Sequence, residues 1–174
     1  MTTEELDSYL ELLKTEGWNV ELKQDGGVNL SESFTTRYPR SPEDYVKFLA
    51  RVASCANAAD NCWFICTDDY NGSSDAAFAW NEFEQIEAES AEGEDEALVE
   101  IHTFWDRHLP FMLSVGGDYA YLALVVSGDK YGSVVDGYGP DFEGVTEVAS
   151  SFEEFVRLHS SAVKGNNPDL KEFV

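Results

Sequence analysis

The chain contains few basic residues relative to its acidic ones. Lys and Arg together number 11 against 34 Asp and Glu, so the 174 residues carry a formal net charge of −23. A surface this negative repels phosphates, which argues against nucleic acids and anionic membrane surfaces as direct partners. It attracts basic proteins over long range, although an acidic surface that only maintains solubility is the competing interpretation.

Cysteine is also scarce, and long hydrophobic runs are missing. The odd number of cysteines (Cys55, Cys62 and Cys66) and the Cys62-x-x-x-Cys66 spacing match no zinc or redox motif. We interpret all three as small buried residues of a protein in a reducing compartment. The opening MTTEELDSYL lacks the apolar core of a signal peptide, and no apolar run reaches the roughly 18 residues of a membrane span. These features predict a soluble, cytoplasmic protein.

Familiar catalytic and metal-binding motifs are not found in the sequence. The histidines, His102, His108 and His159, form neither an H-E-x-x-H nor an H-x-H pattern, and no serine lies in a G-x-S-x-G turn. Neighbouring acids such as Asp68 and Asp69 arise by chance in so acidic a chain, so they do not identify an acid–base pair. We expect a protein that is not an enzyme, with no catalytic residues, metal or cofactor.

Two adjacent glycines, Gly116 and Gly117, precede Asp118 and an apolar stretch. Such a pair lets the backbone turn sharply, and it can also form a loop that holds an anion. A phosphate loop needs a nearby Lys or the N-terminus of a following helix. Here a strand is expected to follow, and no Lys or Arg lies between Arg107 and Lys130. The pattern therefore favours a turn that starts a strand.

Hydrophobic spacing predicts helices separated by strands. Helices are expected over residues 3–15, from Pro42 to Val52, over 98–105 and from Phe152 onward. Strands are expected in a hairpin over residues 18–30 that turns at Asp25–Gly27, and over 61–67, 76–83, 118–126 and 131–138. The strand over residues 61–67 is expected to be buried on both faces. The stretch 118–126 is apolar on both faces, which places it in the middle of a sheet. Residues 84–96 are expected to form an exposed helical turn and a loose linker, and residues 161–174 a loose tail.

The distribution of charge suggests a binding face. From Val52 to Asp106 the chain has fourteen acidic residues and no Lys or Arg. Like charges this dense destabilise a fold, and a chain that needs only solubility usually intersperses both signs. We therefore predict a face that binds a basic protein, with Tyr70 as an exposed aromatic anchor. The candidate contact residues are Asp68, Asp69, Tyr70, Asp75, Glu82 and Glu84.

The order of four motifs resembles the SMI1/KNR4 (SUKH) superfamily. These motifs are YPRSPEDYVKFLARV, DDYNG before FAWNEFE, FWDRHLPFMLSVGGDYAYLALVVSGDKYGSVV, and VASSFEEFVRLHS. The resemblance covers roughly residues 37–160, and residues 1–36 are expected to form an N-terminal lead-in, a helix and hairpin, of the same globular unit. SCANAADNC stands where the family often has Asn-Gly-Gly after its Pro-led helix.

The resemblance implies a fold and a class of function. It implies a single α+β domain with a mostly antiparallel sheet flanked by helices, acting as a binding module without catalytic residues. Bacterial members are commonly immunity proteins that neutralise a toxin, often a nuclease, and fungal relatives regulate cell-wall synthesis through protein contacts. Together with the acidity, this predicts an immunity protein that inhibits a basic, nuclease-type toxin domain. The alternative is a regulatory or scaffold protein that acts without a toxin.

Overall fold

A seven-stranded antiparallel sheet, in which each strand pairs with the next along the chain, organises residues 1–174 of the computed structural model. Its strands are β1 (Asn19–Leu22), β2 (Val52–Ala56), β3 (Cys62–Phe64), β4 (His108–Ser114), β5 (Ala120–Val125), β6 (Val134–Tyr138) and β7 (Asp141–Ala149). β1 and β7 are the two edges. The expected single α+β domain with an antiparallel sheet and flanking helices is confirmed.

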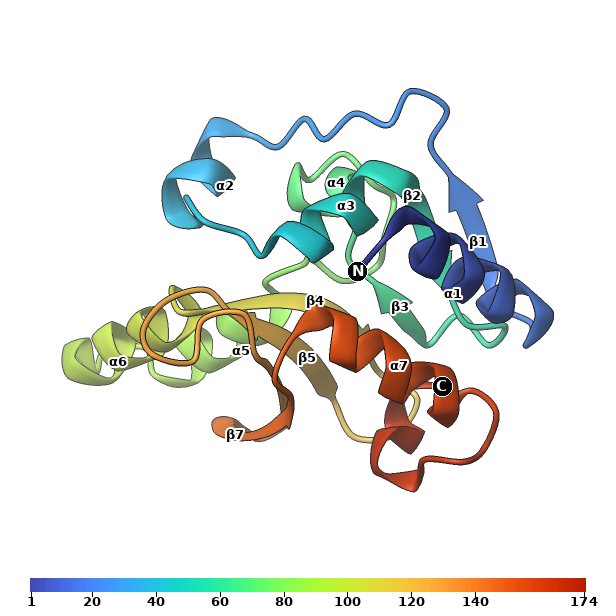
Figure 1. Ribbon diagram of the computed structural model, residues 1–174. Coiled ribbons are helices and arrows are strands. Elements are labelled where there is room, and N and C mark those ends of the chain that lie inside the picture. Colours follow the sequence, from blue (N-terminus) through green and yellow to red (C-terminus); the bar gives the residue numbers. More distant parts are fainter.

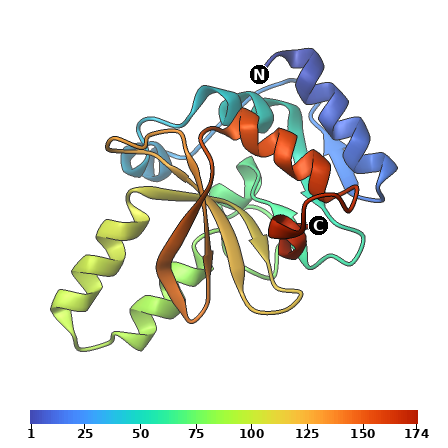
Figure 2. The same cartoon turned by 60° about the horizontal axis from the view of Figure 1, so that its bottom comes forward.

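Helices pack on both faces of this sheet. They are α1 (Thr3–Thr15), α2 (Glu32–Arg37), α3 (Glu43–Arg51), α4 (Thr67–Tyr70), α5 (Glu82–Ser90), α6 (Asp95–Trp105), α7 (Phe152–Ala162) and the 3-10 helix η1 (Pro168–Phe173). α1, α3 and α7 lie together over one face, while α5 and α6 form a helical hairpin that projects from the other side (Figures 1 and 2). None of the helices combines the length and hydrophobicity that a membrane span requires.

Capping residues explain where α1 and α7 begin. The hydroxyl of Thr2 accepts the backbone N–H of Glu5, and the Glu5 carboxylate accepts the N–H of Thr2, so α1 starts with the expected capping box. At α7 the Ser151 hydroxyl accepts the N–H of Glu154 at 3.1 Å. The expected helices at both ends of the chain are therefore confirmed.

The strand β4 was not among the strands expected from the sequence, and it contains Pro110. Proline cannot donate to a ladder and is tolerated within sheets mainly at bulges. The pairing of β4 with β5 shifts register between Pro110 and Met112, which is where the bulge lies. β4 is thereby accommodated between β3 and β5, and the turn at Gly116–Gly117 joins β4 to β5 as a structural corner.

Two predictions of strands from the sequence are wrong. The hairpin over residues 18–30 does not form, because β1 pairs with β2 and the chain then runs without a strand along the outside of the molecule to α2 (Figure 1). Residues 76–83 form no strand; Phe78 lies in a loop and Phe83 already belongs to α5. The acidic residues 84–96 are mostly helical, since they complete α5 and begin α6.

The C-terminal segment is packed rather than loose. Leu170 and Phe173 of η1 are buried in the core. The Phe173 carbonyl accepts a hydrogen bond from Nε2 of His159 at 2.6 Å, which leaves Nδ1 of His159 to accept the Tyr9 hydroxyl proton at 2.7 Å. His159 is fully buried, and burial lowers its pKa to about 4. This neutral imidazole connects α1, α7 and η1.

Candidate binding groove

The sheet has one face under α1, α3 and α7, and half of its opposite face is left open. Strand alternation directs Glu21, Ser54 and Trp63 to the face opposite α1, α3 and α7. Tyr121 of β5 is covered on this face by Phe83 of α5 and Trp105 of α6, with ring centroids 6.1 and 4.8 Å away. Over β1–β3, by contrast, the chain forms only the loop after α4. A groove of about 660 Å³ lies between this loop and the three strands.

The groove is lined by carboxylates and by no basic side chain. The acidic residues are Glu21, Asp60, Asp68, Asp69 and Asp75. Asp69 is partly engaged, because its carboxylate accepts the backbone N–H of Cys66 at 2.6 Å and caps α4. The carboxylates of the other four form no hydrogen bond or ion pair within the chain. These four charges are therefore available to a partner.

Aromatic rings form part of the groove and extend from it. Trp63 and Phe78 line the groove, and their ring centroids are 6.0 Å apart. The ring of Tyr119 lies next to that of Phe78, with a centroid distance of 5.8 Å. Trp63 and Phe78 are partly exposed, and Tyr119 is 41% exposed. Partly exposed, rigid aromatic rings beside charged groups are typical of the anchor residues of protein interfaces.

The structure brings together three of the residues expected from the sequence and separates the others. Asp68, Asp69 and Asp75 all line the groove. Tyr70 does not serve as the expected exposed anchor, because it is only 4% exposed. Its hydroxyl donates to the Pro110 carbonyl at 2.6 Å and lies 2.7 Å from the Tyr45 hydroxyl. The single turn of α4 points Tyr70 into the core while its acidic neighbours remain outside.

Glu82 and Glu84 lie on α5, outside the groove. Glu82 accepts the backbone N–H of Ala79 at 3.2 Å where the helix begins. Glu84 is buried, accepts two 2.7 Å hydrogen bonds from the Arg37 guanidinium, and lies 2.8 Å from Nδ1 of His102. Glu84 therefore stabilises the packing of α2 against α5 and α6, and it is not an open surface contact.

Sequence reasoning missed Glu21, Asp60, Trp63, Phe78 and Tyr119. The strand containing Trp63 was expected to be buried on both faces, and Glu21 was assigned to a hairpin that does not form. Only the pairing of β1 with β2 places Glu21 beside the loop that carries Asp68. The alternation of Asn19, Val20 and Glu21 could have indicated an exposed face, but not what lies across from it.

Other polar clusters of the molecule differ from the groove in composition. A cavity of about 920 Å³ between α1 and α7 contains Arg157 and Lys164 as well as acids. No set of His, Cys, Asp and Glu side chains is arranged to hold a metal ion. The three cysteines are buried, which raises the pKa of each thiol and keeps it protonated and unreactive. The groove is thus the site that combines open charge with open apolar surface.

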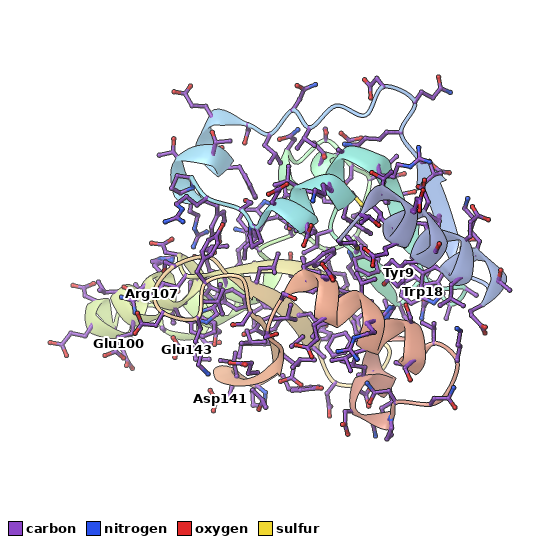
Figure 3. All side chains as sticks on the ribbon, viewed as in Figure 1. Tyr9, Trp18, Glu100, Arg107, Asp141 and Glu143 are labelled. Carbon is purple, nitrogen blue, oxygen red and sulfur yellow. The ribbon has the colours of Figure 1, made fainter.

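A second acidic cluster lies between α5, α6 and β7. Glu87 lines this cavity of about 330 Å³ with Glu100 and Glu143. Figure 3 shows Glu100, Asp141 and Glu143 gathered at one end of the molecule, far from Tyr9 and Trp18. Burial is the main cause that raises the pKa of Glu87 to about 7, and the charges of Glu143 and Asp141 add to it. Trp105 opposes this shift by donating its indole N–H to Glu87 at 2.7 Å.

We expect Glu87→Gln to stabilise the protein at about pH 8 and to change little at about pH 4. The folded-state pKa of Glu87 is raised, so its contribution is fully present below its ordinary pKa of 4.5 and is lost as the pH rises through about 7. Gln stays neutral and still accepts the Trp105 N–H. Urea unfolding at the two pH values measures the effect, with the exposed Glu92→Gln as control. An equal change at both pH values would contradict this assignment.

The open antiparallel meander, helices on both faces and half-open sheet define a single-domain α+β protein. The chain belongs to the SMI1/KNR4 family (SUKH-1), whose sequence model matches residues 40–158. This confirms the resemblance seen in the motifs. Proteins of this family are commonly immunity proteins and are generally non-catalytic. Comparison with curated proteins gave no significant match.

Proposed function

We propose that this protein is a cytoplasmic immunity protein that binds a basic, nuclease-type toxin domain and inhibits it. The observation that carries the proposal is the groove with five carboxylates, an apolar and aromatic lining and no basic residue. Nucleases bind the phosphates of their substrates with Lys and Arg. Carboxylates that form ion pairs with those side chains would occupy the phosphate-binding surface and exclude the substrate.

The charge of the protein and the composition of the groove favour both a fast association rate and a high affinity. The net charge of −23 accelerates the approach of a basic partner, and the acids at the groove orient it. Apolar surface then contributes to affinity once water is displaced, and Trp63 and Phe78 provide rigid rings for this. Family membership supports a protein partner, since immunity proteins act by stoichiometric contact.

The proposal predicts that Asp68→Lys combined with Asp75→Lys weakens the complex at least about tenfold, most strongly at low salt. Both side chains are exposed and make no hydrogen bond within the chain, so the fold should remain intact. The matched control is Glu92→Lys with Asp129→Lys, which changes the net charge equally at exposed positions outside the groove. Circular dichroism and thermal unfolding verify the fold of both double variants.

The partner is obtained by passing native lysate over the immobilised protein at low salt and eluting with a salt gradient. A retained basic protein is then assayed for nuclease activity with the wild-type protein and with each double variant. Inhibition that only the groove variant loses supports the proposal. If both double variants lose inhibition equally, overall charge and not the groove is responsible. If the retained protein has no toxic activity to inhibit, the regulatory role known in the family applies instead.

A further inference from the structure

The edge strand β1 has a free row of backbone groups beside the groove. It is the first strand of the sheet and pairs only with β2. Outside that pairing, residues 19–22 make no backbone–backbone hydrogen bond. An edge of this kind is a template for an additional strand from a partner. One of its side chains, Glu21, lines the groove directly.

The two sides of β1 differ in chemistry. Asn19 and Glu21 are exposed on the groove side, and Glu21 forms no ion pair with its own chain. Val20 and Leu22 are partly buried on the side where α1, α3 and α7 pack. A strand added to this edge would place alternate side chains on these two sides. It would be favoured by basic residues opposite Glu21 and by apolar residues beside Val20 and Leu22.

The other edge strand, β7, is a poorer template. Its register with β6 shifts twice, between Val134 and Val135 and between Asp136 and Tyr138. Bulges of this kind twist an edge away from further pairing. The pairing of β1 with β2 shifts once, between Glu21 and Leu22, and is regular over residues 19–21. The cavity next to β7 is also half the volume of the groove beside β1, at about 330 Å³ against about 660 Å³.

We infer that β1 and the groove bind an extended segment of the basic partner, in which basic and apolar residues alternate, as an added strand of the sheet. This inference rests on the proposed function and specifies the mode of binding. Charge decides between the possible occupants. A second copy of this chain would bring another Glu21 and another net charge of −23 to the same edge, which disfavours pairing of two copies. A basic segment complements both the edge and the five carboxylates beside it.

The test uses the full chain and short peptides capped at both ends. In the first peptide Arg and Val alternate, and in the second the same residues are grouped so that all Arg precede all Val. A third peptide keeps the alternation but carries backbone N-methyl groups at every second residue on the edge-pairing side. Affinity is measured by fluorescence polarisation at physiological salt. Hydrogen exchange reports the protection of the amides of residues 19–22.

The alternating peptide is expected to bind about tenfold more tightly than the grouped one, to lose this advantage on N-methylation, and to protect amides of β1. Glu21→Lys should weaken its binding, whereas Asp129→Lys should not. Equal affinity for both peptide orders without protection of β1 would overturn the strand-addition inference, while the acidic groove could still bind and inhibit a toxin. A dimer that forms through β1, or no binding of either peptide, would likewise overturn it.

Discussion

Replacing Arg37 with Ala is expected to lower the free energy of unfolding by about 3–5 kcal/mol. Arg37 donates two 2.7 Å hydrogen bonds to Glu84 and a third of the same length to Asp106. The Glu84 side chain is only 7% exposed, so removal of the guanidinium leaves a carboxylate buried without its main counter-charge. The loss of packing of the Arg37 side chain on Tyr38 and Trp80 adds to the effect.

The matched control for this prediction is Arg51→Ala. Arg51 also forms an ion pair, with Asp7 at 2.9 Å, but both side chains are about two-fifths exposed. Solvent screens such a pair, so its loss should cost less than about 1 kcal/mol. Urea unfolding followed by circular dichroism gives both values. Similar effects of the two substitutions would show that Glu84 finds adequate solvation without Arg37, and the buried network would then not stabilise the fold.

The second large effect is a loss of stability in acid that originates at His159. Its folded-state pKa of about 4 lies below its ordinary value of 6.5, because the ring is fully buried. Between these values the unfolded chain binds a proton that the folded chain does not. Stability therefore falls as the pH falls from about 6.5 to about 4, by about 3 kcal/mol in total. Protonation would also convert Nδ1 into a donor facing the Tyr9 hydroxyl, which would have to reorient.

His159→Gln separates this contribution from the others. A Gln side chain can donate to the Phe173 carbonyl and accept from Tyr9, but it does not titrate. Glu87 makes stability rise as the pH falls over part of the same pH range. The pH dependence of wild-type stability alone therefore does not isolate the contribution of His159. As the pH falls from about 7 to about 4, wild type is expected to lose about 3 kcal/mol of unfolding free energy relative to His159→Gln. A difference that stays constant from about pH 7 to about pH 4 would rule out His159 as the origin.

Local sequence patterns predicted an element correctly where the residues of that element alone determine its structure. The capping box at Thr2 and Glu5 and the apolar spacing after it predict α1 correctly. The apolar stretch that became β5 was correctly expected in the middle of the sheet, with all six residues buried. The motifs that carry the family resemblance overlap almost completely with residues 40–158, which the family match covers.

Expectations failed where the partner of a segment lies far along the chain. Asp25–Gly27 has the local chemistry of a hairpin turn, yet β1 pairs with β2, which begins thirty residues after β1 ends. Pro110 argues against a strand by its local chemistry, yet a bulge between strands on both sides accommodates it. These outcomes depend on pairing energies between distant segments, which no local pattern contains.

The sequence by itself determined the α+β class, the family, the main helices and the strong negative charge, because composition and short-range periodicity express these directly. Only the tertiary structure decided which acids are available to a partner. Asp68 and Glu84 look alike in the sequence, but packing exposes the first in the groove and buries the second against Arg37. A carboxylate can bind a partner only where the fold leaves it solvated and unpaired, and that depends on what the rest of the chain places beside it.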